Sequence, residues 1–172
     1  MDDARAARIR LLCLDVDGIL TDGGIIIDTH GVETKRFDVR DGIAIRAWKA
    51  LGHEVAIITG RSSMCVTHRA EELDIRLLAQ GVSDKRAMLL EMTRSLELEA
   101  DEVAAMGDDW ADISMLRACG YAMTVSDAAK EVKAIAAFTT VRPGGRGAVR
   151  EAIEHLVRAR GEWETLLQMY ES

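Results

Sequence analysis

The chain has 172 residues, of which 48% are hydrophobic but only 4% aromatic, and its formal net charge is −7. This length suffices for one domain with an aliphatic core, so we predict a single domain over residues 1–172. The acidic balance argues against a nucleic-acid partner, which requires a basic face, and no apolar run approaches the ~20 residues that span a bilayer, so no membrane partner is expected.

The first part of the chain predicts two buried strands, a hairpin and a helix. Residues 9–15 form a continuous apolar run of strand length. Residues 24–39 contain two β-prone arms around a turn, the pattern of a hairpin. Residues 41–52 have apolar side chains at helical spacing and end on a glycine that suits the C′ position. A second buried strand is expected over residues 53–60.

The remainder of the chain continues to alternate helix and strand. In chain order we expect a helix at 61–75, a strand at 75–81, a helix at 83–98 with a serine or aspartate cap, a strand at 101–109, a helix at 110–120, a strand at 121–126, a helix at 127–136, a strand at 138–141, a helix at 147–161 and an amphipathic tail at 162–172. This alternation predicts an α/β fold, a three-layer sandwich around a mostly parallel, Rossmann-like sheet with a protruding hairpin.

Polar side chains follow four of the predicted strands. They are Asp15 and Asp17 after the first strand, Thr59, Gly60 and Arg61 after the second, Lys85 at the head of the helix after the third, and Gly107, Asp108 and Asp109 after the fourth. In an open α/β sheet, ligands bind beyond the carboxyl ends of the strands. We therefore expect these groups to face one crevice.

The residue types in this crevice indicate phosphoryl transfer. Clustered carboxylates raise one another's pKa values or bind a cation, and a set of oxygen donors without histidine or cysteine suits Mg²⁺. Lys85 and Thr59 supply a positive charge and a hydroxyl donor for a transferring phosphoryl group. Asp15 is the candidate nucleophile, which would form an aspartyl-phosphate. Asp17 lies on the same side of an extended chain, where it could act as the general acid and base.

Three further acidic residues complete this prediction. Asp108 is expected to complete the metal site. Asp109 and Asp112 are expected behind it, where they would orient water or Lys85.

Three cysteines, Cys13, Cys65 and Cys119, are scattered without metal-ligand spacing, which is typical of reduced thiols. Residues 1–10 are charged and lead into a strand, unlike a signal peptide. Both features predict a cytoplasmic protein.

Four segments together identify a resemblance. "DVDGILTDG" from Asp15, "IITGR" ending at Arg61, "SDK" ending at Lys85 and "GDDWAD" ending at Asp112 resemble the four motifs of the haloacid dehalogenase superfamily of phosphatases. The resemblance covers roughly residues 9–161. It implies that Asp15 is the nucleophile and a metal ligand and that Asp108 is the remaining carboxylate ligand.

The same resemblance implies roles for the other motif residues. Asp17 matches the acid and base, whose main-chain carbonyl binds the metal, and Thr59 and Lys85 match the phosphate binders. The positions that match substrate-contacting residues are Asp17, Asp38, Val39, Arg40, Asp41, Gly42, Arg46, Gly60, Arg61, Arg69 and Lys85.

Further segments narrow the implied substrate. "FDVRDGIAIR", "TGR" followed by Arg69, and "GGRGAVRE" resemble superfamily members that hydrolyse 3-deoxy-D-manno-octulosonate 8-phosphate for lipopolysaccharide synthesis. The arginines at 40, 46, 61 and 69 suit the carboxylate of such a substrate, because a guanidinium binds a carboxylate through two hydrogen bonds. The 9-phosphate of a nonulosonic, sialic-type acid is the alternative substrate, although Arg61 favours the octulosonate. Trp110 and Ser114 depart from the family pattern.

The intervals between the motifs leave no room for a cap domain. The interval from Asp17 to Thr59 holds the hairpin and one helix, and the interval from Lys85 to Asp108 holds one helix and one strand. The resemblance implies a homotetramer in which the hairpins pair into a central barrel and a neighbouring subunit covers the site. The loop around Arg146, or the tail with Trp163 and Tyr170, is a candidate for that cover.

Other classes of protein use similar groups. A receiver-type phosphoacceptor domain also combines carboxylates, threonine and lysine around Mg²⁺, but its paired acids precede the phosphorylated aspartate. Here the pair at Asp108 comes last. A phosphotransferase or mutase shares the covalent step, although an open site favours hydrolysis. A non-catalytic protein with this fold is the remaining alternative.

Overall fold

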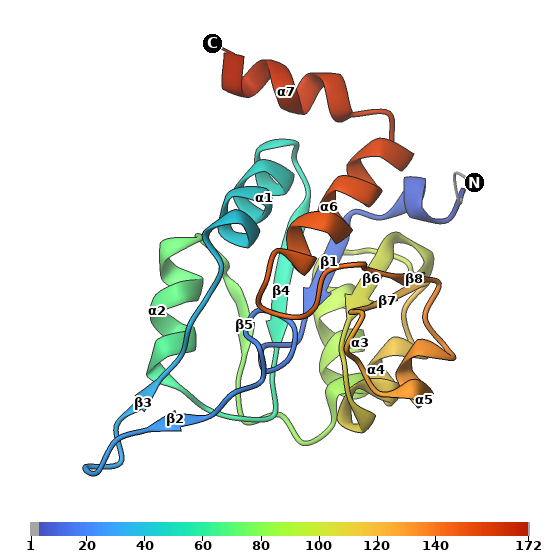
Figure 1. Cartoon of the computed structure of the whole chain (residues 1–172). Helices are drawn as coiled ribbons and strands as arrows, with labels where there is room; N and C mark the ends of the chain where they lie inside the picture. The colour runs from blue at the N-terminus through green and yellow to red at the C-terminus, as the bar shows by residue number, and fades with distance from the viewer. Residues whose placement is uncertain (1–3, 172) are drawn as a thin grey trace.

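The computed structural model describes residues 4–171 and contains a six-stranded, fully parallel sheet (Figure 1). Its strands are β1 (Leu11–Leu14), β4 (Glu54–Ile58), β5 (Leu77–Ala79), β6 (Val103–Met106), β7 (Tyr121–Thr124) and β8 (Phe138–Thr139). They lie in the order β5-β4-β1-β6-β7-β8. The central strand β1 is buried along its whole length, which agrees with its continuous apolar sequence.

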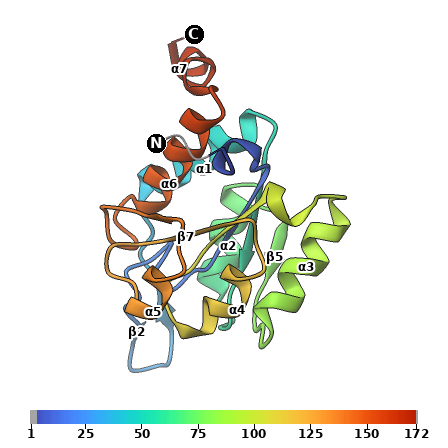
Figure 2. The same cartoon turned by 90° about the vertical axis from the view of Figure 1, so that its right-hand side faces the viewer.

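Helices cover both faces of the sheet. They are η1 (Ala6–Arg8), α1 (Val39–Ala50), α2 (Met64–Glu72), α3 (Lys85–Ser95), η2 (Ala100–Glu102), η3 (Trp110–Asp112), α4 (Ile113–Leu116), α5 (Lys130–Lys133), α6 (Ala148–Ala159) and α7 (Trp163–Glu171). Helices α1 and α6 pack together on one face, and α3 packs with α4 on the other (Figure 2). The predicted three-layer α/β sandwich is confirmed.

The predicted hairpin is also present and projects away from the sheet (Figure 1). Strands β2 (Ile26–Ile27) and β3 (Glu33–Thr34) pair antiparallel. In the turn, the side chain of Asp28 accepts hydrogen bonds from the backbone N–H groups of His30 and Val32. More than half of the Ile26 side-chain surface is exposed, so the apolar arm has no partner within residues 4–171.

Several element boundaries differ from the sequence prediction. The helix expected at 110–120 is a 3₁₀ turn followed by one α-helical turn, because Asp109 and Asp112 form a reciprocal capping box that tightens the chain. The helix expected at 127–136 is confined to α5, and η1 was not predicted. Among the described residues, no helix is long and apolar enough to cross a membrane.

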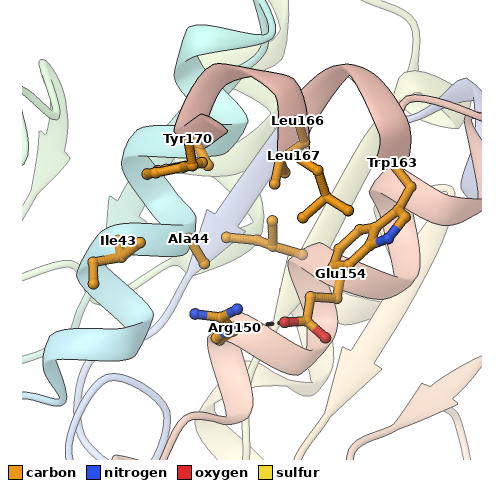
Figure 3. Close-up of a pocket in the computed structure, with 10 residues that line it drawn as sticks. Ile43, Ala44, Arg150, Glu154, Trp163, Leu166, Leu167 and Tyr170 are labelled. Carbon is orange, nitrogen blue, oxygen red and sulfur yellow. Dashed lines mark hydrogen bonds and ion pairs between the residues drawn. The ribbon is translucent and has the colours of Figure 1, made fainter. Parts of the chain in front are cut away.

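The C-terminal helix α7 lies across α1 and α6 of its own chain (Figure 3). The guanidinium of Arg158 lies 3.5 Å from the centre of the Trp163 ring, a cation–π contact that anchors the start of α7. Between the three helices is a largely apolar cavity of about 270 Å³, with the ion pair of Arg150 and Glu154 at its edge.

Candidate active site

The strand order explains how distant motif residues meet. Strands β4 and β6 flank β1, so the residues that follow these three strands emerge at the same edge of the sheet. The residues that line the resulting crevice, of about 320 Å³, are Asp15, Asp17, Gly23, Thr59, Gly60, Arg61, Lys85, Asp108, Asp109, Ala111 and Asp112. The structure therefore brings together the predicted nucleophile, acid, hydroxyl, lysine and carboxylates.

Lys85 links two of the carboxylates. Its Nζ donates to Asp15 Oδ1 at 2.7 Å and to Asp112 Oδ1 at 2.5 Å, and all three side chains are almost completely buried. Burial lowers the pKa of Lys85, but the two carboxylates outweigh burial and raise it overall. Lys85 is therefore held charged beside Asp15. Asp84 places it there by capping α3 through a hydrogen bond from Ala87 N–H.

Three carboxylates form a cluster suited to a cation. Ligand atoms of Asp15, Asp108 and Asp112 lie within 4.8 Å of one another. Burial, with Asp112 nearby, raises the pKa of Asp15 to about 6. Burial, with Asp112 and Asp15 nearby, raises the pKa of Asp108 to about 7. A divalent cation would relieve this repulsion, and oxygen donors of this kind are those that Mg²⁺ prefers.

The loop after β6 is shaped to hold this cluster. Asp112 Oδ2 accepts hydrogen bonds from the backbone N–H groups of Asp108 at 3.0 Å and Asp109 at 3.2 Å. A Cβ placed on Gly107 would lie 2.4 Å from the Asp112 side chain, so only glycine fits there. Asp112 thus holds both the Lys85 side chain and the Asp108 backbone through hydrogen bonds.

Asp17 also lines the crevice, and its contacts involve residues that were not predicted from the sequence. Its Oδ1 accepts a hydrogen bond from Lys35 Nζ, and its Oδ2 lies 3.6 Å from Arg61 Nε. Glu33 pairs with Arg61 at 2.9 Å and approaches Lys35 at 3.4 Å. Lys35 and Glu33 lie in the hairpin, where only their alternation along an exposed arm could have marked them.

Thr59 is buried at the end of β4. Its backbone N–H donates to Ala79, and its carbonyl accepts from Val82 N–H, which fixes the residue in the turn after the strand. Its hydroxyl has no hydrogen-bond partner among residues 4–171, so it is available to a ligand in the crevice.

The start of α1 lies outside the crevice. Asp38 caps the helix by accepting from Arg40 N–H, and Arg40 forms two side-chain hydrogen bonds to it. Asp41 is 1% exposed, and its Oδ1 accepts from Arg150 N–H at 2.8 Å. Val39 is largely exposed, and Gly42 packs against Arg69.

Three of the four predicted substrate arginines bind residues outside the crevice, the first being Arg40 at the start of α1. Arg46 donates to the Glu72 carbonyl at 2.8 Å, and Arg69 pairs with the Glu72 side chain at 2.7 Å. Arg69 also donates to the Asp38 carbonyl. Of the arginines predicted to contact substrate, Arg61 is the one that lines the crevice within residues 4–171.

Comparison with known proteins places the chain in a class of enzymes. The profile of haloacid dehalogenase-like hydrolases matches residues 75–153. The chain is 41% identical over 160 residues to 3-deoxy-D-manno-octulosonate 8-phosphate phosphatase KdsC of Yersinia pestis, with 93% of this chain and 86% of that protein covered. The Escherichia coli K12 protein of the same name is 42% identical over 159 residues, covering 92% and 85%. The chain belongs to the haloacid dehalogenase-like hydrolase family.

Solved structures narrow the class further. A 3-deoxy-D-manno-octulosonate 8-phosphate phosphatase from Moraxella catarrhalis, in complex with magnesium, phosphate and KDO, matches with a TM-score of 0.94 and 39% identity over 96% of this chain and 95% of that one. The cobalt-bound enzyme from Haemophilus influenzae matches with a TM-score of 0.89 and 32% identity over 92% of each chain. Relatives in sequence and in structure thus include phosphatases of the same name.

Proposed function

We propose that the protein is a Mg²⁺-dependent phosphatase that hydrolyses 3-deoxy-D-manno-octulosonate 8-phosphate to the free sugar acid and phosphate, a step of lipopolysaccharide precursor synthesis. One observation carries the proposal: the buried Asp15 side chain lies in the crevice against Lys85 and beside Asp108, in a chain about 41% identical to phosphatases of that name. The receiver-type alternative is disfavoured, since the acid pair follows β6 and not the first strand.

In the proposed reaction, a carboxylate oxygen of Asp15 attacks phosphorus and the bond to the sugar oxygen breaks. Lys85 and the Thr59 hydroxyl bind the equatorial phosphoryl oxygens. Asp17 gives a proton to the leaving sugar oxygen and later takes one from the water that hydrolyses the aspartyl-phosphate. Asp112 keeps Lys85 in place throughout.

Asp15, Asp108 and the main-chain carbonyl of Asp17 would hold Mg²⁺. The raised pKa values of the Asp15 and Asp108 carboxyls are the observation that favours a cation there. Bound Mg²⁺ would supply positive charge to the phosphoryl group and keep the carboxylates ionised.

The substrate carboxylate has one arginine in the crevice, Arg61, as a candidate partner. The other three arginines, Arg40, Arg46 and Arg69, pair with Asp38 and Glu72. They would therefore affect substrate binding only by holding the backbone and the helix in position. The nonulosonate 9-phosphate remains the alternative substrate.

The crevice is open to solvent, and we propose that assembly closes it. An apolar hairpin that has no partner within residues 4–171 suits burial in a homotetramer, where a neighbouring subunit would cover the site. A cytoplasmic location is proposed from the scattered thiols, none of which forms a disulfide within residues 4–171.

Phosphate release from a panel of sugar acid phosphates, with Mg²⁺ and with EDTA, tests the function. We expect the octulosonate 8-phosphate to be the best substrate and EDTA to abolish turnover. Asp15→Asn should lower kcat by at least about a thousandfold, while Asp28→Asn, in the hairpin turn, serves as the matched control. Preference for a nonulosonate 9-phosphate would refute the substrate, and full turnover by Asp15→Asn would refute the mechanism.

A further inference from the structure

A second pocket lies next to η3, which also contributes residues to the catalytic crevice. It has a volume of about 610 Å³ and is lined by Arg86, Trp110, Ile113, Ser114 and Arg117. It shares no lining residue with the crevice, although Arg86 follows Lys85 and Trp110 follows Asp109 in the chain. Trp110 and Ser114 are also the two positions at which the sequence departs from the family pattern.

The two arginines of this pocket are unusual in the molecule. Neither Arg86 nor Arg117 forms a side-chain hydrogen bond, ion pair or ring contact within residues 4–171. Every other arginine in that range has a carboxylate, carbonyl or ring partner. In a protein of net charge −7, two unpaired guanidiniums in one pocket favour an anionic ligand, which each could bind through two hydrogen bonds.

Trp110 adds a flat surface to this pocket. Its side chain is 70% exposed, and its Nε1 donates to Glu131 Oε2 at 3.2 Å, which fixes the orientation of the ring. The Glu131 carboxylate repels an anion from that edge of the indole, so a negative group would lie on the side of the arginines. The remaining ring surface can stack with a planar group.

We propose that this pocket binds a ligand that joins a phosphate to a flat ring, of which a nucleotide is the simplest example. Arg86 and Arg117 bind the phosphate, and the base stacks on Trp110. The pocket is distinct from the catalytic crevice, so this ligand is not the substrate of the proposed phosphatase reaction, and the proposal stands independently of that reaction.

Tryptophan fluorescence tests the proposal directly. Trp48 is fully buried and Trp163 lies under Arg158, so quenching on stacking reports mainly Trp110. The full chain is titrated in EDTA with ADP, adenosine and inorganic phosphate in separate arms, which leaves the catalytic crevice without metal. We expect saturable quenching by ADP, at least about tenfold weaker binding of adenosine and of phosphate, and no quenching in Trp110→Phe.

Charge-matched variants complete the test. The double variant Arg86→Gln with Arg117→Gln should weaken ADP binding at least about tenfold, while Arg94→Gln, on the same helix as Arg86 but outside the pocket, should leave it unchanged. Far-ultraviolet circular dichroism checks that each variant is folded. Absence of saturation at about 10 mM ADP, or equal losses in Arg94→Gln and in the double variant, overturns the proposal.

Discussion

Lys35 connects the hairpin to the proposed acid of the reaction. Its side chain is 1% exposed although it belongs to the protruding hairpin, and its Nζ binds the Asp17 carboxylate, which lines the crevice. Together with Arg61, it holds both oxygens of Asp17. A residue that only orients the general acid should affect the rate most for substrates whose leaving group must be protonated.

This role predicts a dependence on the leaving group. Lys35→Met should lower kcat for a sugar acid phosphate by about 10–100-fold but change kcat for an aryl phosphate, whose leaving group needs no proton, by less than about threefold. KM should move little in both cases, and Lys35→Arg should restore much of the loss. Steady-state kinetics on both substrates provide the measurement, and equal losses on both would show that Lys35 has only a structural role.

Asp41 is a second residue of interest, because its buried environment makes the free energy of unfolding depend on pH. Burial between α1 and α6 raises its pKa to about 6, and its Oδ2 has no hydrogen-bond partner within residues 4–171. The folded protein therefore holds this proton more tightly than the unfolded chain, where the carboxyl has its ordinary pKa of about 3.9. The contribution of Asp41 to the free energy of unfolding is most favourable below about pH 4, falls as pH rises to about 6, and stays low above that.

Asp41→Asn should remove this dependence while the amide oxygen still accepts from Arg150 N–H. At pH 8 we expect the variant to match or exceed the wild-type free energy of unfolding, by at most about 3 kcal/mol, and the difference to shrink towards pH 4. Urea unfolding at a series of pH values measures it. A variant that is less stable at pH 8 than at pH 4, relative to wild type, would contradict the assignment.

At the scale of elements, the loop at residues 142–147 packs against the catalytic loop after β1. Gly145 N–H donates to the Ile19 carbonyl at 2.9 Å. A Cβ on Gly145 would lie 2.4 Å from the Thr21 carbonyl carbon and 2.5 Å from the Asp22 nitrogen. The loop around Arg146 thus braces its own chain's catalytic loop.

The variant Gly145→Ala should consequently displace the loop that carries Asp17. Gly31→Ala is the matched control, since both glycines have positive φ (+63° and +79°) but a Cβ on Gly31 has no atom within 4 Å. We expect a loss of about 1 kcal/mol in the control and about 2–4 kcal/mol in Gly145→Ala, with at least about tenfold lower kcat only in the latter. Thermal unfolding and turnover measure both, and equal effects would show that backbone strain alone is responsible.

The elements also show what the sequence could and could not predict. Buried strands such as β1 could be predicted, because a parallel strand that is covered on both faces has a continuous apolar sequence. The motif residues could be grouped because each follows a strand, and the sheet order then placed them together. The partners of Arg46 and Lys35 could not be predicted, because they depend on how α1 meets α2 and how the hairpin folds back over Asp17.

At the scale of the whole molecule, the exposed hairpin and the open crevice are linked, because a side chain of the hairpin binds an aspartate that lines the crevice. Ile26 is 56% exposed on the first arm of the hairpin, and Lys35, which follows the second arm, binds Asp17 in the crevice. An apolar strand edge of this kind invites pairing with another chain. Burial of the hairpin by a second copy would therefore also fix the position of Lys35.

Ile26→Lys tests this coupling, because a charge on the apolar arm should prevent assembly without touching the crevice. Light scattering should show a lower molar mass than wild type, and kcat/KM should fall at least about tenfold because the open site loses its cover and the hairpin its support. Val141→Lys, at a side chain that is 85% exposed elsewhere on the surface, should change neither quantity. If Ile26→Lys keeps the wild-type mass, the hairpin does not mediate assembly. If it is monomeric and fully active, the site needs no neighbour.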